Sequence, residues 1–172
     1  MEIYLVRHAE ALERKEGLAD EIRHLTCKGR KQAAKQAKRI KKAGVRPELI
    51  ITSPLVRAVQ TAEFMAAQLG RDAVVASHAS LSPDASLEEV LKLLKTSEKL
   101  KSIMLVGHEP HLSSLAAAMM GYEHVSSLHK GGCLCLSWRP ARPDASASFC
   151  WYAQPGRKAV KSARKFTARK NG

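Results

Sequence analysis

The sequence predicts an α/β fold of three layers, an α/β/α sandwich with a mostly parallel sheet between helices. Short apolar runs rich in β-branched residues alternate with longer amphipathic segments. Strand and helix alternate four times, a pattern typical of parallel strands joined by helical crossovers. Two final strands flank the turn-rich segment 139–144, so the C-terminal strand is expected to be antiparallel.

The expected strands are short apolar runs at residues 3–6, 49–51, 73–76, 103–106, 133–138 and 147–151. The first and fourth runs each lead into a histidine. Residues 9–25 contain several acidic side chains and show no clear period, so they predict a loop with room for one helical turn. A long loop at the C-terminal end of a strand is a common place for substrate contacts.

Capping residues set the expected helix starts. Thr26 suits an N-cap, and Ser86 with Glu89 matches a capping box. Ser53 is expected to cap a third helix, with Pro54 in its first position. A fourth helix is expected to begin near residue 110. Glycines suit the helix ends at positions 44, 70 and 121.

Length and composition suit one domain. At 172 residues with 45% hydrophobic content, the domain is expected over residues 1–155, followed by a basic tail over 156–172. No apolar run approaches the ~18 residues that a membrane span needs, and the N-terminal run is too short for a signal peptide. We therefore expect a cytoplasmic protein with no membrane partner.

The cysteines predict reduced thiols rather than a metal site. Cys133 and Cys135 alternate along an expected strand and so share a face, while Cys27 and Cys150 stand alone. A Cys-x-Cys pair without a second ligand pair at suitable spacing is a poor zinc signal. Free cysteines of this kind behave as small hydrophobic residues.

The net charge is +13 and unevenly distributed. The segment 156–172 has seven basic residues and no acidic residue, and a second basic cluster spans 28–42. Such charge favours anionic partners, so an acidic partner for the tail is expected. The alternative is a solvated helix face and a solvated tail. Aromatic residues are scarce at 5% and are not interleaved with the basic ones, which makes a nucleic-acid partner unlikely.

The strand ends predict a site for an oxyanion. Parallel strands end at the same edge of a sheet, where ligands bind. This edge would bring together Arg7 and His8, Arg57 at a helix start, and His108. Two guanidinium groups beside a helix N-terminus suit phosphate. A histidine among them stays neutral and nucleophilic, because nearby positive charge disfavours the imidazolium. This chemistry requires no metal, and nearby acidic residues show no metal-ligand spacing.

Three sequence blocks resemble the signatures of the histidine phosphatase superfamily, which has the phosphoglycerate mutase-like fold. They are LVRHAE at 5–10, SPLVRAVQTA at 53–62 and VGHEP at 106–110. The small size and the LT pair at 25–26, followed by Gly29, resemble its SixA-type phosphohistidine phosphatase branch. The resemblance covers residues 2–152. It implies that His8 is the transiently phosphorylated nucleophile and that Arg7, Arg57 and His108 bind the phosphoryl group, without a cofactor.

Two departures from the family pattern bear on the substrate. Ala9 stands where the motif usually has glycine, and the segment 80–84 lacks the glutamate general acid of larger members. Asp84 is a weak substitute for that acid. Phosphohistidine protonated on its other ring nitrogen leaves as neutral imidazole and needs an acid less than an alkyl phosphate does. The chain also lacks the long insertions with which larger members enclose sugar phosphates, so phosphohistidine on another protein is the expected substrate.

Two other functions remain open from the sequence alone. The first is a phosphatase or mutase that acts on small phosphate esters. The second is a non-catalytic module that binds phosphate or nucleic acid through the fold and the basic tail. The presence of both histidines and both arginines argues against the second alternative.

Overall fold

The computed structural model describes residues 1–70, 74–139 and 146–167. Within them, one sheet has the strand order β3-β2-β4-β1-β5-β6. The strands are β1 (Glu2–Arg7), β2 (Leu49–Thr52), β3 (Val74–Ser77), β4 (Ser102–Gly107), β5 (Cys133–Ser137) and β6 (Ser148–Ala153). The first four run parallel to one another. Strand β5 is antiparallel to its neighbour β1, and β6 is antiparallel to β5. The predicted fold class is therefore confirmed.

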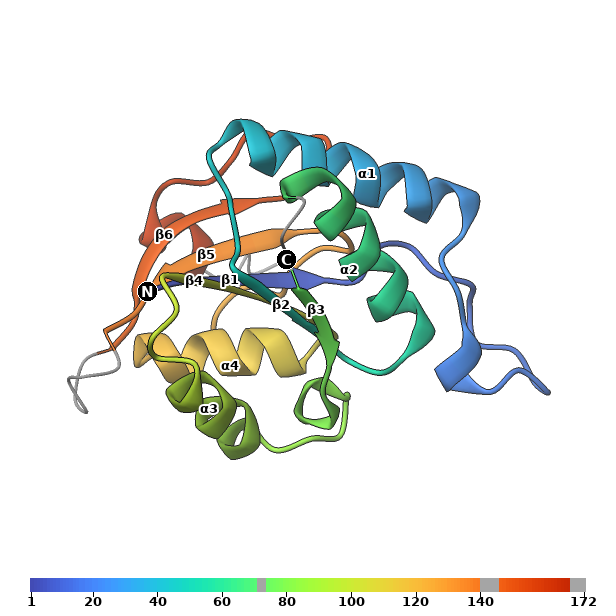
Figure 1. Ribbon diagram of the computed structural model, residues 1–172, viewed down its shortest axis with the longest axis horizontal. Helices are drawn as coiled ribbons and strands as arrows, with labels where there is room; N and C mark the ends of the chain where they lie inside the picture. Colours follow the sequence, from blue (N-terminus) through green and yellow to red (C-terminus); the bar gives the residue numbers. More distant parts are fainter. Residues whose placement is uncertain (71–73, 140–145, 168–172) are drawn as a thin grey trace.

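Helices cover both faces of the sheet. They are α1 (Cys27–Lys42), α2 (Val56–Leu69), α3 (Leu87–Thr96), α4 (His111–Met120) and the short α5 (Ala163–Thr167). Figure 1 shows α1 and α2 on one face and α3 and α4 on the other, which gives the three expected layers. A 3-10 turn, Asp20–Ile22, lies in the predicted loop between β1 and α1, and a second, Ala79–Leu81, follows β3.

Local capping explains most of the helix boundaries. The Thr26 hydroxyl accepts a hydrogen bond from the Gly29 N–H at 2.9 Å, and the Ser86 hydroxyl accepts one from the Glu89 N–H at 3.3 Å. Gly121 ends α4 in the left-handed conformation, with φ 71°. The caps at Thr26 and Ser86 and the glycine stop at Gly121 are confirmed, whereas the return bond from the Glu89 side chain that completes a capping box is not found among the described residues.

The prediction that Ser53 caps α2 is wrong. That helix begins at Val56, and its N-cap residue, Leu55, makes no side-chain capping bond. Ser53 is fully buried, and its hydroxyl forms a hydrogen bond with the ring of His108. A serine before a proline is typical of a helix cap. In this fold the Ser53 hydroxyl instead contacts His108, the residue that follows β4.

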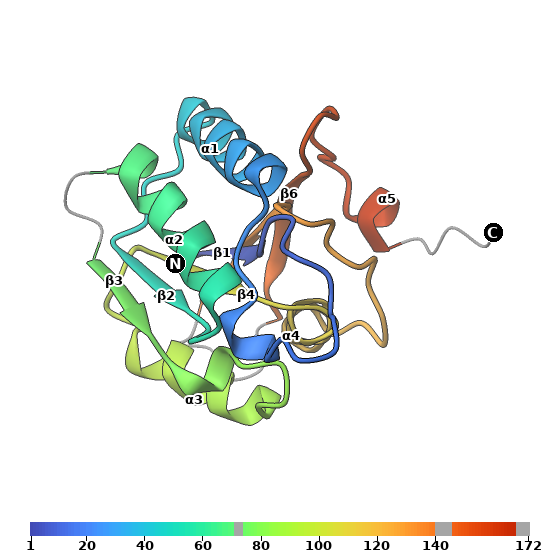
Figure 2. The same ribbon diagram turned by 90° about the vertical axis from the view of Figure 1, so that its right-hand side faces the viewer.

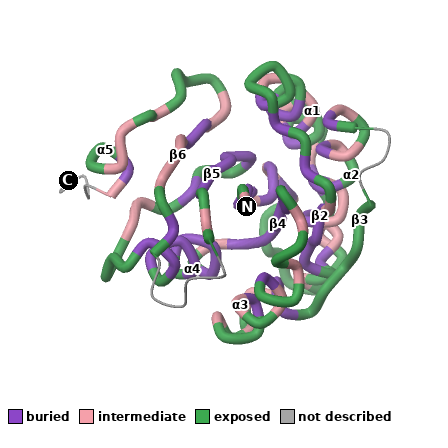
Figure 3. Tube along the Cα trace, turned by 60° about the vertical axis from the view of Figure 1, so that its left-hand side comes forward, coloured by how far each residue is buried: buried purple, intermediate pink, exposed green. Residues whose placement is uncertain are grey.

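The two central parallel strands, β1 and β4, position the site. Their register pairs Val6 with Val106 and Arg7 with Gly107. Both strands are almost wholly buried, and buried purple segments lie in the middle of the tube in Figure 3. Successive β1 side chains point to opposite faces of the sheet. They pack alternately into the core under α3 and α4 and into the core under α1 and α2. Packing on both faces of the sheet therefore fixes the positions of the last residues of β1 and β4 and of the histidines that follow them.

Part of the predicted basic tail packs onto the domain. Val160 forms an isolated bridge with Tyr152, and the buried Phe166 stacks on Phe149 with ring centroids 5.3 Å apart. The basic residues of this segment are mostly exposed. Residues 168–172, and with them two of the predicted tail cations, lie outside the described residues, as do residues 140–144 of the predicted turn.

The described chain has no helix long and apolar enough to cross a membrane. All four cysteines are free thiols; three are buried or half-buried, as predicted, whereas Cys27 at the start of α1 is exposed. Cys133 and Cys135 are buried in the core under α1 and α2, and burial raises the pKa of both thiols.

Candidate active site

Two histidines face each other at the carboxyl-terminal edge of the sheet. His8 follows β1 and His108 follows β4, and their ring centroids are 5.1 Å apart at an interplanar angle of 54°. Both rings are buried. The adjacency of β1 and β4 thus brings together two residues that lie far apart in the sequence, as predicted from the strand ends.

His8 is held in one tautomer. Its Nδ1 lies 2.7 Å from the Ala9 carbonyl oxygen. A carbonyl oxygen only accepts, so Nδ1 carries the proton and donates it, and Nε2 keeps its lone pair. Burial lowers the pKa of His8 to about 4; the bond to Ala9 opposes the shift, and Arg57 and Arg7 add to it. His8 is therefore a neutral imidazole near pH 7.

The hydrogen bonds of Ser53 fix the proton on His108. The Ser53 hydroxyl accepts the Leu55 N–H at 3.3 Å and lies 2.8 Å from His108 Nε2. A fully buried hydroxyl must also donate, and no other acceptor for it is present in the described chain. Ser53 therefore donates to Nε2, which leaves the proton of His108 on Nδ1. That nitrogen has no partner among the described residues and is free to donate to a ligand.

His108 is also neutral. Burial lowers its pKa to about 3, and the nearby His8 and Arg57 lower it further. Because neither histidine is charged, the positive charge of the site comes from its arginines.

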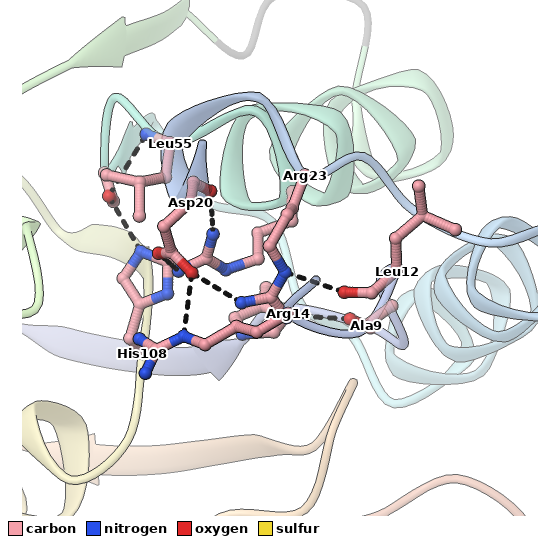
Figure 4. A network of polar contacts seen from close by, with 10 residues as sticks. Ala9, Leu12, Arg14, Asp20, Arg23, Leu55 and His108 are labelled. Carbon is pink, nitrogen blue, oxygen red and sulfur yellow. Dashed lines mark hydrogen bonds and ion pairs between the residues drawn. The ribbon is translucent and has the colours of Figure 1, made fainter. Parts of the chain in front are cut away.

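Arg57 lies in the first turn of α2, is buried, and pairs with the half-buried carboxylate of Asp20. Its Nη1 donates to the Asp20 carbonyl oxygen at 2.7 Å, and its Nη2 donates to Asp20 Oδ2 at 2.8 Å. The other oxygen of Asp20 accepts from Arg23 and from Arg14 (Figure 4). Burial by itself raises the pKa of Asp20, but the hydrogen bonds from the three arginines outweigh it and hold that pKa well below its usual range.

Arg7 stands apart from this network. Its Nη1 donates to the Leu128 carbonyl oxygen at 2.8 Å, while its buried Nε has no partner in the described chain. The Glu109 carboxyl group is near enough for Arg7 to lower its pKa slightly, but burial is the larger cause and raises that pKa. The Glu109 oxygens are buried, and hydrogen bonds from the Ser113 side chain and from the backbone at Leu128 and Ser113 also lower the pKa against the effect of burial.

The structure therefore brings His8, Arg57 and His108 together, with Arg7 beside them. Asp84, the weak candidate for the general acid, is exposed on the loop before α3. The described residues contain no cluster of three or more histidine, cysteine, aspartate or glutamate side chains that could hold a metal ion.

Sequence reasoning missed Asp20, Arg23 and Glu109. The only signal for Asp20 and Arg23 was their place in a long loop after β1, which Figure 2 shows as the blue segment crossing the carboxyl-terminal edge of the sheet. Glu109 stood beside His108 in the sequence and was treated as part of a turn.

A family model described as histidine phosphatase superfamily (branch 1) matches residues 3–82. An uncharacterised protein of Picosynechococcus is 37% identical over 150 residues, which cover 84% of this chain and 90% of that protein. A mitochondrial serine/threonine-protein phosphatase of Drosophila virilis is 36% identical over 78 residues, but these are only 26% of its length.

Solved structures share the fold over most of the chain. The protein histidine phosphatase SixA complexed with tungstate has a TM-score of 0.82 at 22% identity, covering 90% of this chain and 97% of that one. A structure described as a phosphohistidine phosphatase SixA from Agrobacterium tumefaciens has 0.75 at 26% identity, covering 90% and 98%. A mycobacterial glucosyl-3-phosphoglycerate phosphatase has 0.66 at 18% identity, covering 88% and 96%.

Proposed function

The chain belongs to the histidine phosphatase superfamily, with the fold of the SixA-type branch, and we propose that it removes the phosphoryl group from phosphohistidine on a protein. Family membership makes the chain a phosphatase; the substrate is our proposal. The observation that carries it is the state of His8, a neutral imidazole whose Nδ1 proton is held by the Ala9 carbonyl and whose Nε2 is free.

The proposed reaction has two displacements. The lone pair of His8 Nε2 attacks phosphorus, and the P–N bond of the substrate breaks with its electron pair passing to the departing ring nitrogen. Because the other nitrogen of that ring carries a proton, the ring leaves as neutral imidazole. Water then attacks phosphorus, the bond to Nε2 breaks, and the proton lost by the water passes to the released phosphate. The Ala9 carbonyl holds the Nδ1 proton of His8 in both steps.

The remaining site residues would stabilise charge on the phosphoryl oxygens. Arg57 and Arg7 supply guanidinium N–H groups, and the free Nδ1–H of His108 supplies a neutral donor from the opposite side. Stabilisation of this kind is the main catalytic demand in phosphoryl transfer. The solved SixA structure complexed with tungstate, a tetrahedral oxyanion, is consistent with such a site. The proposed steps need no metal and no cofactor.

The acidic residues around the site favour phosphohistidine over an ester. Asp20 is held ionised by three arginines and has no proton to give. Burial raises the pKa of Glu109, but its carboxyl is engaged by Ser113 and by the backbone at Leu128, and Asp84 is exposed on a separate loop. An alkoxide leaving group needs a positioned acid, whereas neutral imidazole does not.

We further propose that the partner protein is acidic where it meets this enzyme. The basic residues of α1 are mostly exposed, and of the ion pairs in the described chain only that of Lys28 with Glu10 involves this helix. The segment after β6 adds further exposed cations, and Pro155 and Gly156 line a groove of about 330 Å³ with α1. The cytoplasmic location stays a prediction.

Transfer of labelled phosphoryl from a phosphohistidine-bearing protein tests the proposal. The reaction is quenched within seconds in alkali, because histidine phosphate survives alkali and is lost in acid. We expect label on the wild-type protein, release of phosphate with time, and no label on His8→Ala. His124→Ala is the matched control, because this histidine is exposed and lies outside the site, and it should retain the label.

Each other outcome has a defined meaning. Label from a small phosphate ester but none from phosphohistidine would keep His8 as the nucleophile and make the protein a small-molecule phosphatase. Label that persists in His8→Ala would reject the assigned nucleophile. Absence of label from either donor would reject the covalent mechanism and favour a binding module.

A further inference from the structure

The guanidinium that the proposed function assigns to the phosphoryl group is already bound to an anion. Both terminal nitrogens of Arg57 donate to Asp20, one to its backbone oxygen at 2.7 Å and one to its carboxylate at 2.8 Å. The Arg57 side chain is 4% exposed, so water competes little for these bonds. Paired donors on one guanidinium are the geometry with which arginine binds phosphate.

The Asp20 carboxylate acts on His108 as well as on Arg57. Its charge acts on His108, where it partly offsets the lowering of the pKa by burial. Figure 4 shows Asp20 in the middle of the polar network, with His108 in the same group of side chains. Because a phosphoryl group on His8 would use the same guanidinium nitrogens, it and the Asp20 carboxylate would compete for Arg57.

Asp20 belongs to a loop that carries its own counterions. The Oδ1 atom accepts from Arg23 Nη1 at 2.5 Å and from Arg14 Nε at 3.0 Å, and both arginines lie in the same loop as Asp20. Arg23 Nε also donates to the Leu12 carbonyl at 2.7 Å, which ties the two limbs of the loop together. The carboxylate could therefore leave Arg57 without being stranded as an unpaired charge, because two of its three cations move with it.

We propose that Asp20 is the resident anion of the phosphoryl site, bound to Arg57 in the resting enzyme and displaced by the incoming phosphoryl group. This inference rests on the proposed function, because it assigns Arg57 to the phosphoryl oxygens. Asp20 then sets specificity, because a ligand must bind Arg57 more strongly than the Asp20 carboxylate does in order to displace it. A doubly charged phosphoryl group anchored by His8 meets that demand, and free phosphate meets it less well, which favours release of the product.

Equilibrium binding of inorganic phosphate, measured by calorimetry, tests the proposal without requiring turnover. We expect Asp20→Asn and Asp20→Ala to bind phosphate about tenfold more tightly than the wild type, because a competing negative charge next to the ligand has been removed. Glu21→Gln is the matched control. It removes the same charge from the neighbouring exposed residue of the same 3-10 turn and should change the affinity less than about twofold.

The sign of the change separates this role from a purely positioning one. If Asp20 only orients Arg57 for the phosphoryl group, both Asp20 variants bind phosphate more weakly than the wild type, and the proposal is overturned. Equal affinities in all variants overturn it as well. The isosteric Asp20→Asn keeps the test valid if Asp20→Ala does not fold, and Arg57→Ala, which should abolish phosphate binding, establishes that the measured site is this one.

Displacement itself can be followed by limited trypsin digestion at Arg14 and Lys15 of the loop. Saturating phosphate should speed cleavage there in the wild type, and Asp20→Asn should be cut faster even without phosphate. Slower cleavage with phosphate would mean that the loop closes further and would overturn the proposal. Phosphohistidine hydrolysis, measured on the same preparations, reports on the proposed function separately, so either idea can fail while the other stands.

Discussion

The molecule carries positive charge in two regions, and the two differ in how that charge is held. At the candidate active site, Arg57 is buried and both ends of its guanidinium have a defined partner. On the outer face of α1, lysines and arginines stand in solvent, with one ion pair for this helix in the described chain. Buried charge acts through geometry, whereas exposed charge acts through a field that salt screens.

The largest expected effect comes from the proton on His108. His108→Asn places an amide N–H near the position of Nδ1–H, whereas His108→Gln places it near Nε2. We expect His108→Asn to retain activity within about tenfold and His108→Gln to lose about 10²- to 10³-fold in kcat, as for loss of an oxyanion donor. Greater activity in His108→Gln than in His108→Asn would show that Ser53 does not set the tautomer.

Substitutions on the inner side of α1 should destabilise the fold far more than substitutions on its outer face. A Cβ on Gly29 would lie 1.8 Å from the Glu10 carbonyl oxygen, so Gly29→Ala must push the helix away from the loop after β1. We expect a loss of about 3 kcal/mol in the free energy of unfolding, measured by urea denaturation. Gly70→Ala is the control and should be nearly neutral, because no atom of the described residues beyond its chain neighbours lies within 4 Å of an added Cβ.

The buried histidines should make stability depend on pH in a way that the exposed cations do not. The pKa of His8 is lowered to about 4 and that of His108 to about 3, so between these values and their unfolded value near ~6.5 the unfolded chain binds more protons. Stability is therefore fully present above pH ~6.5 and falls as the pH drops, by up to ~1.4 kcal/mol per pH unit for each histidine.

Urea denaturation between pH 7.5 and 4.5 checks this dependence. His108→Asn should reduce the slope by about one proton, and the exposed His124→Asn should leave it unchanged. The ion pairs of Asp20 affect stability at lower pH than the histidines do. Because the pKa of Asp20 is lowered, its stabilising contribution is lost only as the pH falls below ~4. Identical slopes in the wild type and His108→Asn would contradict the burial of a neutral ring.

The smallest effect is expected on the outer face of α1. The double variant Lys35→Glu/Lys38→Glu should lower kcat/KM for an acidic phosphoprotein about fivefold at low salt and hardly at all in 0.5 M salt, because it weakens electrostatic steering. Activity on a small phosphate ester should not change. Lys95→Glu/Lys99→Glu reverses the same number of exposed charges at and after α3, across the sheet, and should have no such effect. Equal loss in both doubles would argue against a docking role for α1.

The sequence was sufficient where the information is local or repeats in a strong pattern. The apolar runs 3–6 and 103–106 predicted two buried strands, and their parallel pairing follows from the alternation of strand and helix. The caps Thr26 and Ser86 could be identified because the capping bond joins residues three apart. His8 and His108 were placed together by topology alone.

The parts that the sequence did not predict depend on long-range partners. Asp20 lies in a loop whose sequence shows no periodicity. No local motif predicts its salt bridge to Arg57, which is 37 residues away in the sequence. Ser53 precedes a proline and so resembles a cap, and only the fold shows that its hydroxyl faces His108. Phe166 lies in a strongly basic segment, which concealed that this side chain enters the core. The assigned roles of the site residues remain predictions.

The position of β1 in the middle of the sheet also determines when the protein can fold. Glu2 pairs with Ser102 of β4 on one side and with Ser137 of β5 on the other, so neither neighbour of this strand is close in sequence. Contacts of such long range are slow to form, because the intervening loop must be closed first. On the ribosome, the apolar run Ile3–Val6 emerges before both of its partner strands and stays unpaired until they have been made. During synthesis this segment is therefore an exposed apolar strand without a partner, the kind of segment that is prone to aggregation.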